Sequence, residues 1–280
     1  MPTKQFTSFL AAACLILAGC SGSKSVSKPE EAFSTTSASG DPVYVDVVSF
    51  APVSGIYNDT GKVQINKDYT DIVAECFTAE GDIIYAMFTV DEYKKEIDPE
   101  LDLSNVIVSN VMGDYNTIYY SPARRMHGEV AKADTITDNL AETTGDLVIK
   151  YKSLDAVAEA GEAQPFSEEL KGGDPVYADL VGVLPYYTIS SNNMGGYDGF
   201  ICYAEDENRT VYYLYIDVDD YVKYFDENAQ TSQYDVTKSL DAVYFDGVKR
   251  VKGSVVFSES YSAGLSEEIP AKIIRFESFE

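Results

Sequence analysis

The residues that could support catalysis are few, and a duplication in the chain allows each to be compared with a counterpart. His127 is the only histidine, so catalysis by a nucleophile and a histidine base would depend on it. The segment Arg124-Arg-Met-His-Gly matches Lys249-Arg-Val-Lys-Gly in the second half, with Lys252 in place of the histidine. We therefore interpret His127 as a solvent-facing basic residue. With one histidine, we also expect no zinc site.

Two cysteines outside the N-terminal region, Cys76 and Cys202, lie on apolar faces of predicted strands. Comparison of the two halves matches them as equivalents. A disulfide between them would suit an oxidising compartment. The alternative, which we favour, is one buried thiol in each core, because equivalent inward positions of two domains would exceed the Cα separation of about 4.4 to 6.8 Å that a disulfide needs.

Carboxylates cluster at Asp217-Val-Asp-Asp, where a calcium ion would find hard oxygen ligands. The matching segment Thr89-Val-Asp-Glu carries fewer acids, and no EF-hand spacing follows. An N-cap role for Asp91 and Asp219 would explain both copies as the start of a short helix. We expect no metal and no cofactor.

Tyrosines, aspartates and arginines alternate with apolar residues along the predicted strands. If the apolar faces point inward, the opposite faces form a candidate binding surface. Its residues are Tyr44, Asp46, Tyr85 and Arg125 in the first half and Tyr177, Asp179, Tyr213, Tyr215 and Arg250 in the second. This composition is typical of protein-recognition surfaces, and tyrosine could also stack on a glycan. The alternative is a set of cross-strand pairs that stabilise a solvated sheet.

The duplication itself defines the domains. Gly40-Asp-Pro-Val-Tyr-Val-Asp46 returns as Gly173-Asp-Pro-Val-Tyr-Ala-Asp179, and the second halves of the two repeats align without a gap. We predict repeats over 40–155 and 173–280, joined by a linker over 156–172. Each repeat is long enough for its own core.

Apolar residues recur with a period of two, which indicates half-buried strands. Each repeat predicts three strands, a short helix, and two further strands, the fourth kinked near Gly128 or Gly253. Asn139 and Gly264 predict the same left-handed turn. The element order resembles the OB-fold, a five-stranded Greek-key barrel, and a small β-sandwich stays open. The predicted fold class is all-β, with two tandem, duplicated, OB-like β-barrels.

The N-terminus carries Lys4, an apolar run over 6–17, and Leu17-Ala18-Gly19-Cys20. This resembles a bacterial lipoprotein signal, and the run is too short for a membrane span. The resemblance implies that residues 1–19 are removed and that Cys20 carries the membrane-anchoring lipid. The alternative is an ordinary signal peptide with a chance cysteine. Residues 20–39 are poor in apolar groups and predict a disordered tether.

The charge of the chain excludes one class of partner. The formal net charge is −25, and it becomes −26 when residues 1–19 are removed, because they hold one lysine and no acid. Nucleic-acid binding depends on Lys and Arg at phosphates, so we expect no nucleic-acid partner.

We therefore expect an extracytoplasmic protein, lipid-anchored at the cell surface or the periplasmic face of a bacterial membrane. Its two domains would form a non-catalytic binding or scaffolding module, with a protein or glycan partner in the envelope. Two copies of one site would raise avidity if both engage one target. An envelope hydrolase acting on cell-wall glycan through paired carboxylates, and a spacer without a small ligand, are the alternatives.

Overall fold

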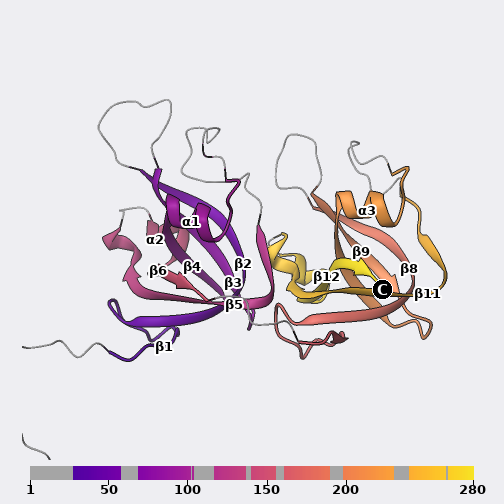
Figure 1. The fold of residues 1–280 in the computed structure, drawn as a ribbon, viewed down its shortest axis with the longest axis horizontal. Coiled ribbons are helices and arrows are strands. Elements are labelled where there is room, and N and C mark those ends of the chain that lie inside the picture. The colour runs from indigo at the N-terminus through magenta and orange to yellow at the C-terminus, as the bar shows by residue number, and fades with distance from the viewer. Residues whose placement is uncertain are drawn as a thin grey trace, which may run out of the picture.

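The structure, a computed structural model, describes residues 28–57, 69–101, 103, 117–136, 140–155, 161–189, 198–229, 240–262 and 264–280. They form two domains that lie side by side, each around one curved six-stranded sheet (Figure 1). The prediction of two all-β domains is confirmed. The predicted signal peptide over 1–19 and Cys20 lie outside the described residues. Within the described part, no helix is long and apolar enough to cross a membrane.

In the first domain, β2 pairs with β3 and β3 with β4, both antiparallel, and β6 joins β4 in parallel. The long strand β5 pairs with β6 on one side and with β2 on the other, which closes the sheet into a barrel. The elements are β1 (Glu31–Ala32), β2 (Pro42–Tyr57), β3 (Tyr69–Thr78), β4 (Ile83–Thr89), α1 (Val90–Glu96), β5 (Ile118–Lys132), the 3-10 turn η1 (Ala133–Thr135), α2 (Leu140–Thr144) and β6 (Leu147–Leu154).

The second domain repeats this topology. Its strands β8, β9, β10, β12 and β11 occupy the places of β2, β3, β4, β6 and β5, and β11 closes the barrel onto β8. The elements are β7 (Gln164–Pro165), β8 (Pro175–Ile189), β9 (Gly199–Glu205), β10 (Val211–Asp217), α3 (Val218–Tyr224), β11 (Val243–Phe257), the 3-10 turns η3 (Ser258–Ser260) and η4 (Leu265–Glu267), and β12 (Lys272–Phe279).

Each barrel encloses its own core. The alternating apolar residues of β2, such as Val43 and Val47, point into the first barrel, and those of β8 fill the second. The short helix after the third barrel strand adds a tyrosine that is fully buried in each domain, Tyr93 in α1 and Tyr221 in α3. Period-two patterning therefore identified the inward faces correctly.

The repeat begins earlier than the sequence comparison predicts. β1 runs parallel to the start of β2, and β7 runs parallel to the start of β8 in the same way. Phe33 donates its backbone N–H to Tyr44, as Phe166 does to Tyr177. The prediction of a tether through residue 39 and of a linker through residue 172 is wrong for these segments: each domain carries an N-terminal arm, over 28–39 and 161–172. Backbone hydrogen bonds hold these arms, so few apolar side chains are needed.

The helix caps also differ from the prediction. Thr89, not Asp91, caps α1: its hydroxyl accepts the Glu92 N–H, and the Glu92 carboxylate accepts the Thr89 N–H. This reciprocal arrangement is a capping box. In α3 the N-cap position belongs to Asp217, two residues before the predicted Asp219, and its side chain makes no cap hydrogen bond.

Both cysteines are free and buried, one in each core, so the interpretation as separate thiols is confirmed. The equivalence of the two is wrong. Phe50 faces Cys76 in the first barrel, whereas Val183, the counterpart of Phe50, faces Ala204. Cys202 therefore lies two residues away from the place of Cys76. The connection between the first two barrel strands differs in length between the repeats, which shifts the correspondence.

A glycine in each long strand allows the backbone of the last strand to approach closely. The pairing of β5 with β6 shifts by one residue between His127 and Gly128, and that of β11 with β12 shifts between Lys252 and Gly253. A Cβ at Gly253 would overlap the carbonyl oxygen of Arg275, and one at Gly128 would overlap that of Lys150. The extra residue of each bulge is Lys152 of β6 or Glu277 of β12, so the irregularity that the sequence predicts in the long strand lies in the last strand, opposite a glycine that the close backbone requires.

The domains contact each other through one end of the first barrel. Phe77, at the end of β3, stacks on Phe257 of β11 with ring centroids 6.0 Å apart. Both rings are buried together with Val48 and Ala79. The Gly172 N–H donates to the Ala79 carbonyl at 2.9 Å. Apolar burial and a backbone hydrogen bond thus fix the second domain on the first.

A tyrosine stack continues this junction. Tyr261 of the second domain lies between Tyr215 of its own β10, with ring centroids 3.8 Å apart, and Tyr119 of the first domain, at 5.2 Å. The guanidinium of Arg275 lies 5.3 Å from the centre of the Tyr119 ring. Stacked rings and a cation over an aromatic face each add to the area burial.

We predict that Gly253→Ala lowers the free energy of unfolding by roughly 1 to 3 kcal/mol, the usual cost of forcing extra atoms into a packed site. Chemical denaturation of the purified protein would measure it. Gly161→Ala is the matched control, because a Cβ there meets no atom within 4 Å. Equal stability of the two variants would contradict the role of Gly253 in closure.

Candidate functional site on the paired tyrosine, aspartate and arginine faces

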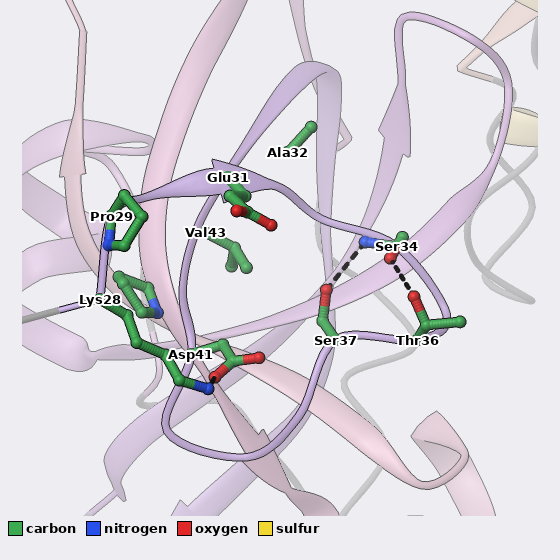
Figure 2. Close-up of a pocket in the computed structure, with 10 residues that line it drawn as sticks. Lys28, Pro29, Glu31, Ala32, Ser34, Thr36, Ser37, Asp41 and Val43 are labelled. Carbon is green, nitrogen blue, oxygen red and sulfur yellow. Dashed lines mark hydrogen bonds and ion pairs between the residues drawn. The ribbon is translucent and has the colours of Figure 1, made fainter. Parts of the chain in front are cut away.

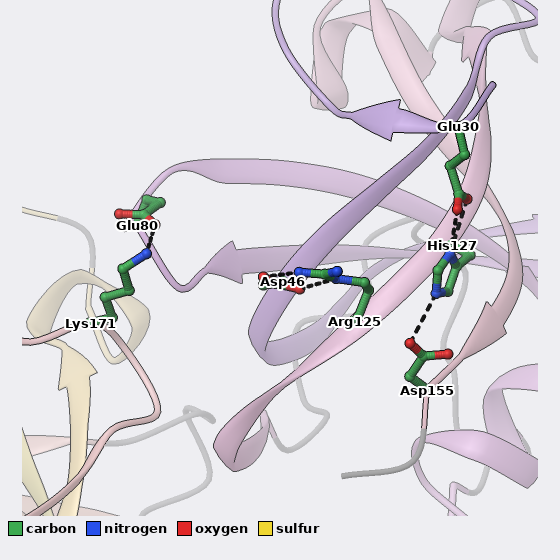
Figure 3. A network of polar contacts seen from close by, with 7 residues as sticks. All are labelled: Glu30, Asp46, Glu80, Arg125, His127, Asp155 and Lys171. Carbon is green, nitrogen blue, oxygen red and sulfur yellow. Dashed lines mark hydrogen bonds and ion pairs between the residues drawn. The ribbon is translucent and has the colours of Figure 1, made fainter. Parts of the chain in front are cut away.

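In the first domain Tyr44, Asp46 and Arg125 meet on the outer face of β2 and β5. Asp46 and Arg125 face each other across the strands. Arg125 donates from Nε and Nη2 to the two Asp46 oxygens at 2.7 and 2.9 Å (Figure 3). Its guanidinium carbon lies 4.4 Å from the centre of the Tyr44 ring. The bidentate ion pair and the ring together fix the plane of the guanidinium.

The second domain repeats this cluster. Arg250 donates from Nε and Nη2 to Asp179, both at 2.7 Å, and its guanidinium carbon lies 4.0 Å from the centre of the Tyr177 ring. The ion-paired side chains are about equally exposed in the two domains, at 44% for Arg125 and 40% for Arg250. We call each set of tyrosine, aspartate and arginine a triad. Both triads lie on the surface, as predicted.

The electrostatics of the triads favour binding over proton transfer. The hydrogen bonds from Arg125 and from Arg250 lower the pKa of Asp46 and of Asp179, respectively, below the ordinary aspartate value. Both carboxylates are therefore ionised at neutral pH and already engaged, so neither can act as a general acid. Each triad instead presents a tyrosine ring with a guanidinium stacked on it, a planar surface suited to contact with another planar or aromatic group.

His127 lies next to the first triad. Its Nδ1 is 2.9 Å from Glu30 of the N-terminal arm, and its Nε2 is 3.2 Å from Asp155, just after β6 (Figure 3). Burial lowers the pKa of His127. The hydrogen bonds to Glu30 and Asp155, together with their charges, raise it by more than burial lowers it, so the pKa lies above its ordinary value. Lys252, the counterpart, pairs with Glu280 at 3.4 Å. In both domains a basic side chain at this position thus pairs with the acid that directly follows the last strand, Asp155 or Glu280. This agrees with a structural rather than a catalytic role for His127.

The N-terminal arm leaves a small polar hollow of about 310 Å³ against the start of β2. Lys28 and Asp41 form a 2.6 Å ion pair at its edge, and Ser34 and Ser37 bond to each other across the turn (Figure 2). The charged groups that line it are already paired or face solvent. We assign no ligand to this hollow.

Three predicted binding residues do not join the triads. Tyr85 donates its hydroxyl to Glu75 at 3.1 Å and packs beneath α2. Tyr213 packs against Tyr203, with ring centroids 6.0 Å apart. Tyr215 is only 5% exposed, in the junction between the domains, so its predicted exposure is wrong. Simple alternation failed here because the outer face of β10 is covered by the connection before β12 and by the first domain.

The acidic segment that suggested calcium serves other contacts. Asp217 accepts the Tyr215 hydroxyl at 3.0 Å and an Arg275 Nη2 proton at 3.1 Å. Among the residues that the structure describes, no cluster of His, Cys, Asp and Glu is arranged to hold a metal ion. The sequence analysis did not single out Arg275. Its alignment with Lys150, the basic residue at the same place in the last strand of the first repeat, is the signal that could have identified it.

We predict that docking of the arm over 28–39 depends on pH through His127. Because the folded pKa is raised, the stabilisation is complete below the unfolded pKa of about 6.5 and is lost as the pH rises through the folded value. Amide exchange of the arm should therefore become faster as the pH rises through this range, after correction for the intrinsic pH dependence. His127→Lys, which copies the second domain, should abolish this change. An identical pH profile for the two proteins would contradict it.

Two comparisons with known proteins found no match. No protein-family model matches it, and no curated protein matches it. Any function must therefore be argued from the geometry of the molecule itself.

Proposed function

We propose that this protein is a lipid-anchored extracytoplasmic lipoprotein whose two barrels act as a non-catalytic binding or scaffolding module. The single observation that carries the proposal is the repetition of the triad, with the same donors, acceptors and stacking in both domains. Neither triad has a carboxylate ready for proton transfer, whereas both offer a half-buried tyrosine beside an exposed ion pair. Tyrosine and arginine are the residues that contribute most at protein interfaces.

The topology supports the description of the barrels as OB-like. Counted along either barrel, the strand order is first, second, third, fifth, fourth, and the fourth closes onto the first. The third and fifth strands are parallel, and a short helix follows the third strand. This resemblance concerns architecture alone, and OB-folds bind various ligands. We therefore argue the partner from the triads.

The membrane anchor rests on the motif Leu17-Ala18-Gly19-Cys20. Acyl chains on Cys20 would hold the protein durably, because each buried methylene contributes about 0.8 kcal/mol. We predict that Cys20→Ser yields an unlipidated chain that retains residues 1–19, which mass spectrometry of the protein from a bacterial host would detect. Cleavage and membrane retention equal to the unsubstituted protein would contradict the anchor.

The binding role is tested by removing the aromatic part of each triad. Tyr44→Ala and Tyr177→Ala, singly and together, should weaken retention of an envelope partner by at least about tenfold in the double variant, the effect of losing one interface hot spot or more. The readout is quantitative cross-linking and mass spectrometry in native envelopes. The melting temperature should fall little, because both rings lie on the outer sheet face, outside the cores, and are only half-buried.

Tyr186→Ala is the matched control, since Tyr186 is 49% exposed and lies outside the triads. Retention lost equally in the control and the double variant would reject the triads as the binding site. Turnover of cell-wall glycan by the purified protein would instead favour the hydrolase alternative.

A further inference from the structure

The second domain carries an uncovered copy of the surface with which the first domain contacts it. In the first domain Tyr119, Ser49 and Phe77 form one row across β5, β2 and β3. Tyr244, Gly182 and Glu205 form the same row across β11, β8 and β9. Tyr119 and Phe77 are packed in the junction, whereas Tyr244 is 81% exposed. We call this surface of each domain the donor face.

Val248 extends the uncovered donor face. It occupies the place of Ala123, whose backbone lies against Gly173 in the junction. Val248 is 44% exposed. A tyrosine and a valine that are exposed to solvent, at positions covered in the other repeat, indicate a surface that a partner of similar shape could cover.

The partner surface is also present twice. In the second domain it consists of Phe257, Arg275 and Tyr261, which contact the first domain. The strand pairing of β5 with β6 places Lys132, Lys150 and Ile136 at the same positions of the first domain. Lys132 and Lys150 are exposed. We call this the acceptor face.

The residue pairs that meet across the junction are replaced by other pairs on the uncovered donor and acceptor faces. Where Phe77 stacks on Phe257 in the junction, the uncovered faces offer Glu205 and Lys132, which are oppositely charged. Where Arg275 lies over the Tyr119 ring, they offer Lys150 and Tyr244, again a cation and a ring. Both faces have changed, and these two pairs stay complementary, whereas Gly81, which lies against the Phe257 ring, is replaced by Arg209 in the equivalent turn. In a chain of net charge −25, exposed lysines at both required positions make a specific match.

A glycine follows the same pattern. A Cβ at Gly172 would lie 2.6 Å from the Phe257 ring, so the junction requires glycine there. The first domain has Ser39 at this position and Lys132 in place of the phenylalanine. The ring that forbids a side chain at position 172 is absent beside Ser39. A Cβ at Gly172 would also lie 3.2 Å from Val48 of the first domain, so in the repeated contact Ser39 would pack against the docking barrel itself.

We propose that copies of this protein associate head to tail, the donor face of one copy's second domain docking on the acceptor face of the next copy's first domain. The contact repeats the geometry of the intramolecular junction. Because the two faces differ, the association is heterologous and continues into an open chain unless its rotation closes a ring. This inference does not depend on the triads, and its partner is a second copy of this chain.

Cross-linking of the full-length protein in membranes tests the proposal. A mixture of a Glu205→Cys chain with a Lys132→Cys chain should form a disulfide-linked dimer under mild oxidation, and the double variant should form a ladder of multimers. Cys76 and Cys202 are buried and should not react. Absence of a dimer in the mixture, or equal cross-linking of each single variant alone, would overturn the proposal.

Charge reversal supplies an independent test in detergent solution, with particle mass measured by sedimentation. Glu205→Lys should weaken association at least about tenfold, because it places like charges across the contact. Mixing it with the Lys132→Glu chain should restore association. Glu227→Lys, an exposed site away from both faces, is the control and should not weaken it. Failure of the mixture to restore association, with melting temperatures unchanged, would reject the contact.

Discussion

The close approach of the last strand to a glycine of the long strand is the constraint on which the rest of the structure depends. At Gly128 and Gly253 the neighbouring backbone leaves no room for a Cβ. Opposite each glycine the last strand carries one extra residue, Lys152 in β6 and Glu277 in β12, so the last strand bulges while β5 and β11 keep pairing on both edges. A side chain at either glycine would push the last strand away from the long strand, and the sheet would have open edges there. Both the enclosed core and the surface features therefore depend on closure of the barrel.

The triads follow from the same closure. Because β5 pairs with β2 in a fixed register, Arg125 faces Asp46 directly, and β11 with β8 gives the same pairing of Arg250 with Asp179. A slip of one residue would turn these side chains to the opposite face. The arginine is then held by two charged hydrogen bonds and a ring. Such a surface is ordered before any partner arrives, which reduces the entropy cost of binding.

The two copies differ most at the junction. Phe77 and Phe257 are apolar where their counterparts, Glu205 and Lys132, are charged, because only the first pair is permanently buried within one chain. A covalently linked interface can be as apolar as a core. A surface that is exposed to solvent whenever its partner is absent carries more charged residues than a permanent interface. The duplication thus supplies the same barrel with two kinds of contact.

The sequence by itself determined the elements and the inward faces. Alternating valines and the repeated Gly-Asp-Pro-Val-Tyr segment sufficed for these, since strand periodicity and core burial are properties of neighbouring residues. The sequence also identified Gly128 and Gly253 as the positions where strand pairing becomes irregular, because a glycine within a strand pattern is a local signal. The sequence placed Asp46 and Arg125 on the same predicted outer face, but it did not predict that they form an ion pair.

Only the tertiary structure decided the contacts between distant segments. The burial of Tyr215, the docking of the arm over 28–39 and the true counterpart of Cys76 depend on strand register, on loop lengths and on where the second domain packs. None of these is encoded in a local pattern, because the groups involved lie from about a dozen to more than a hundred residues apart. Period and composition determined which side chains could be buried or paired, and three-dimensional packing decided which of them are.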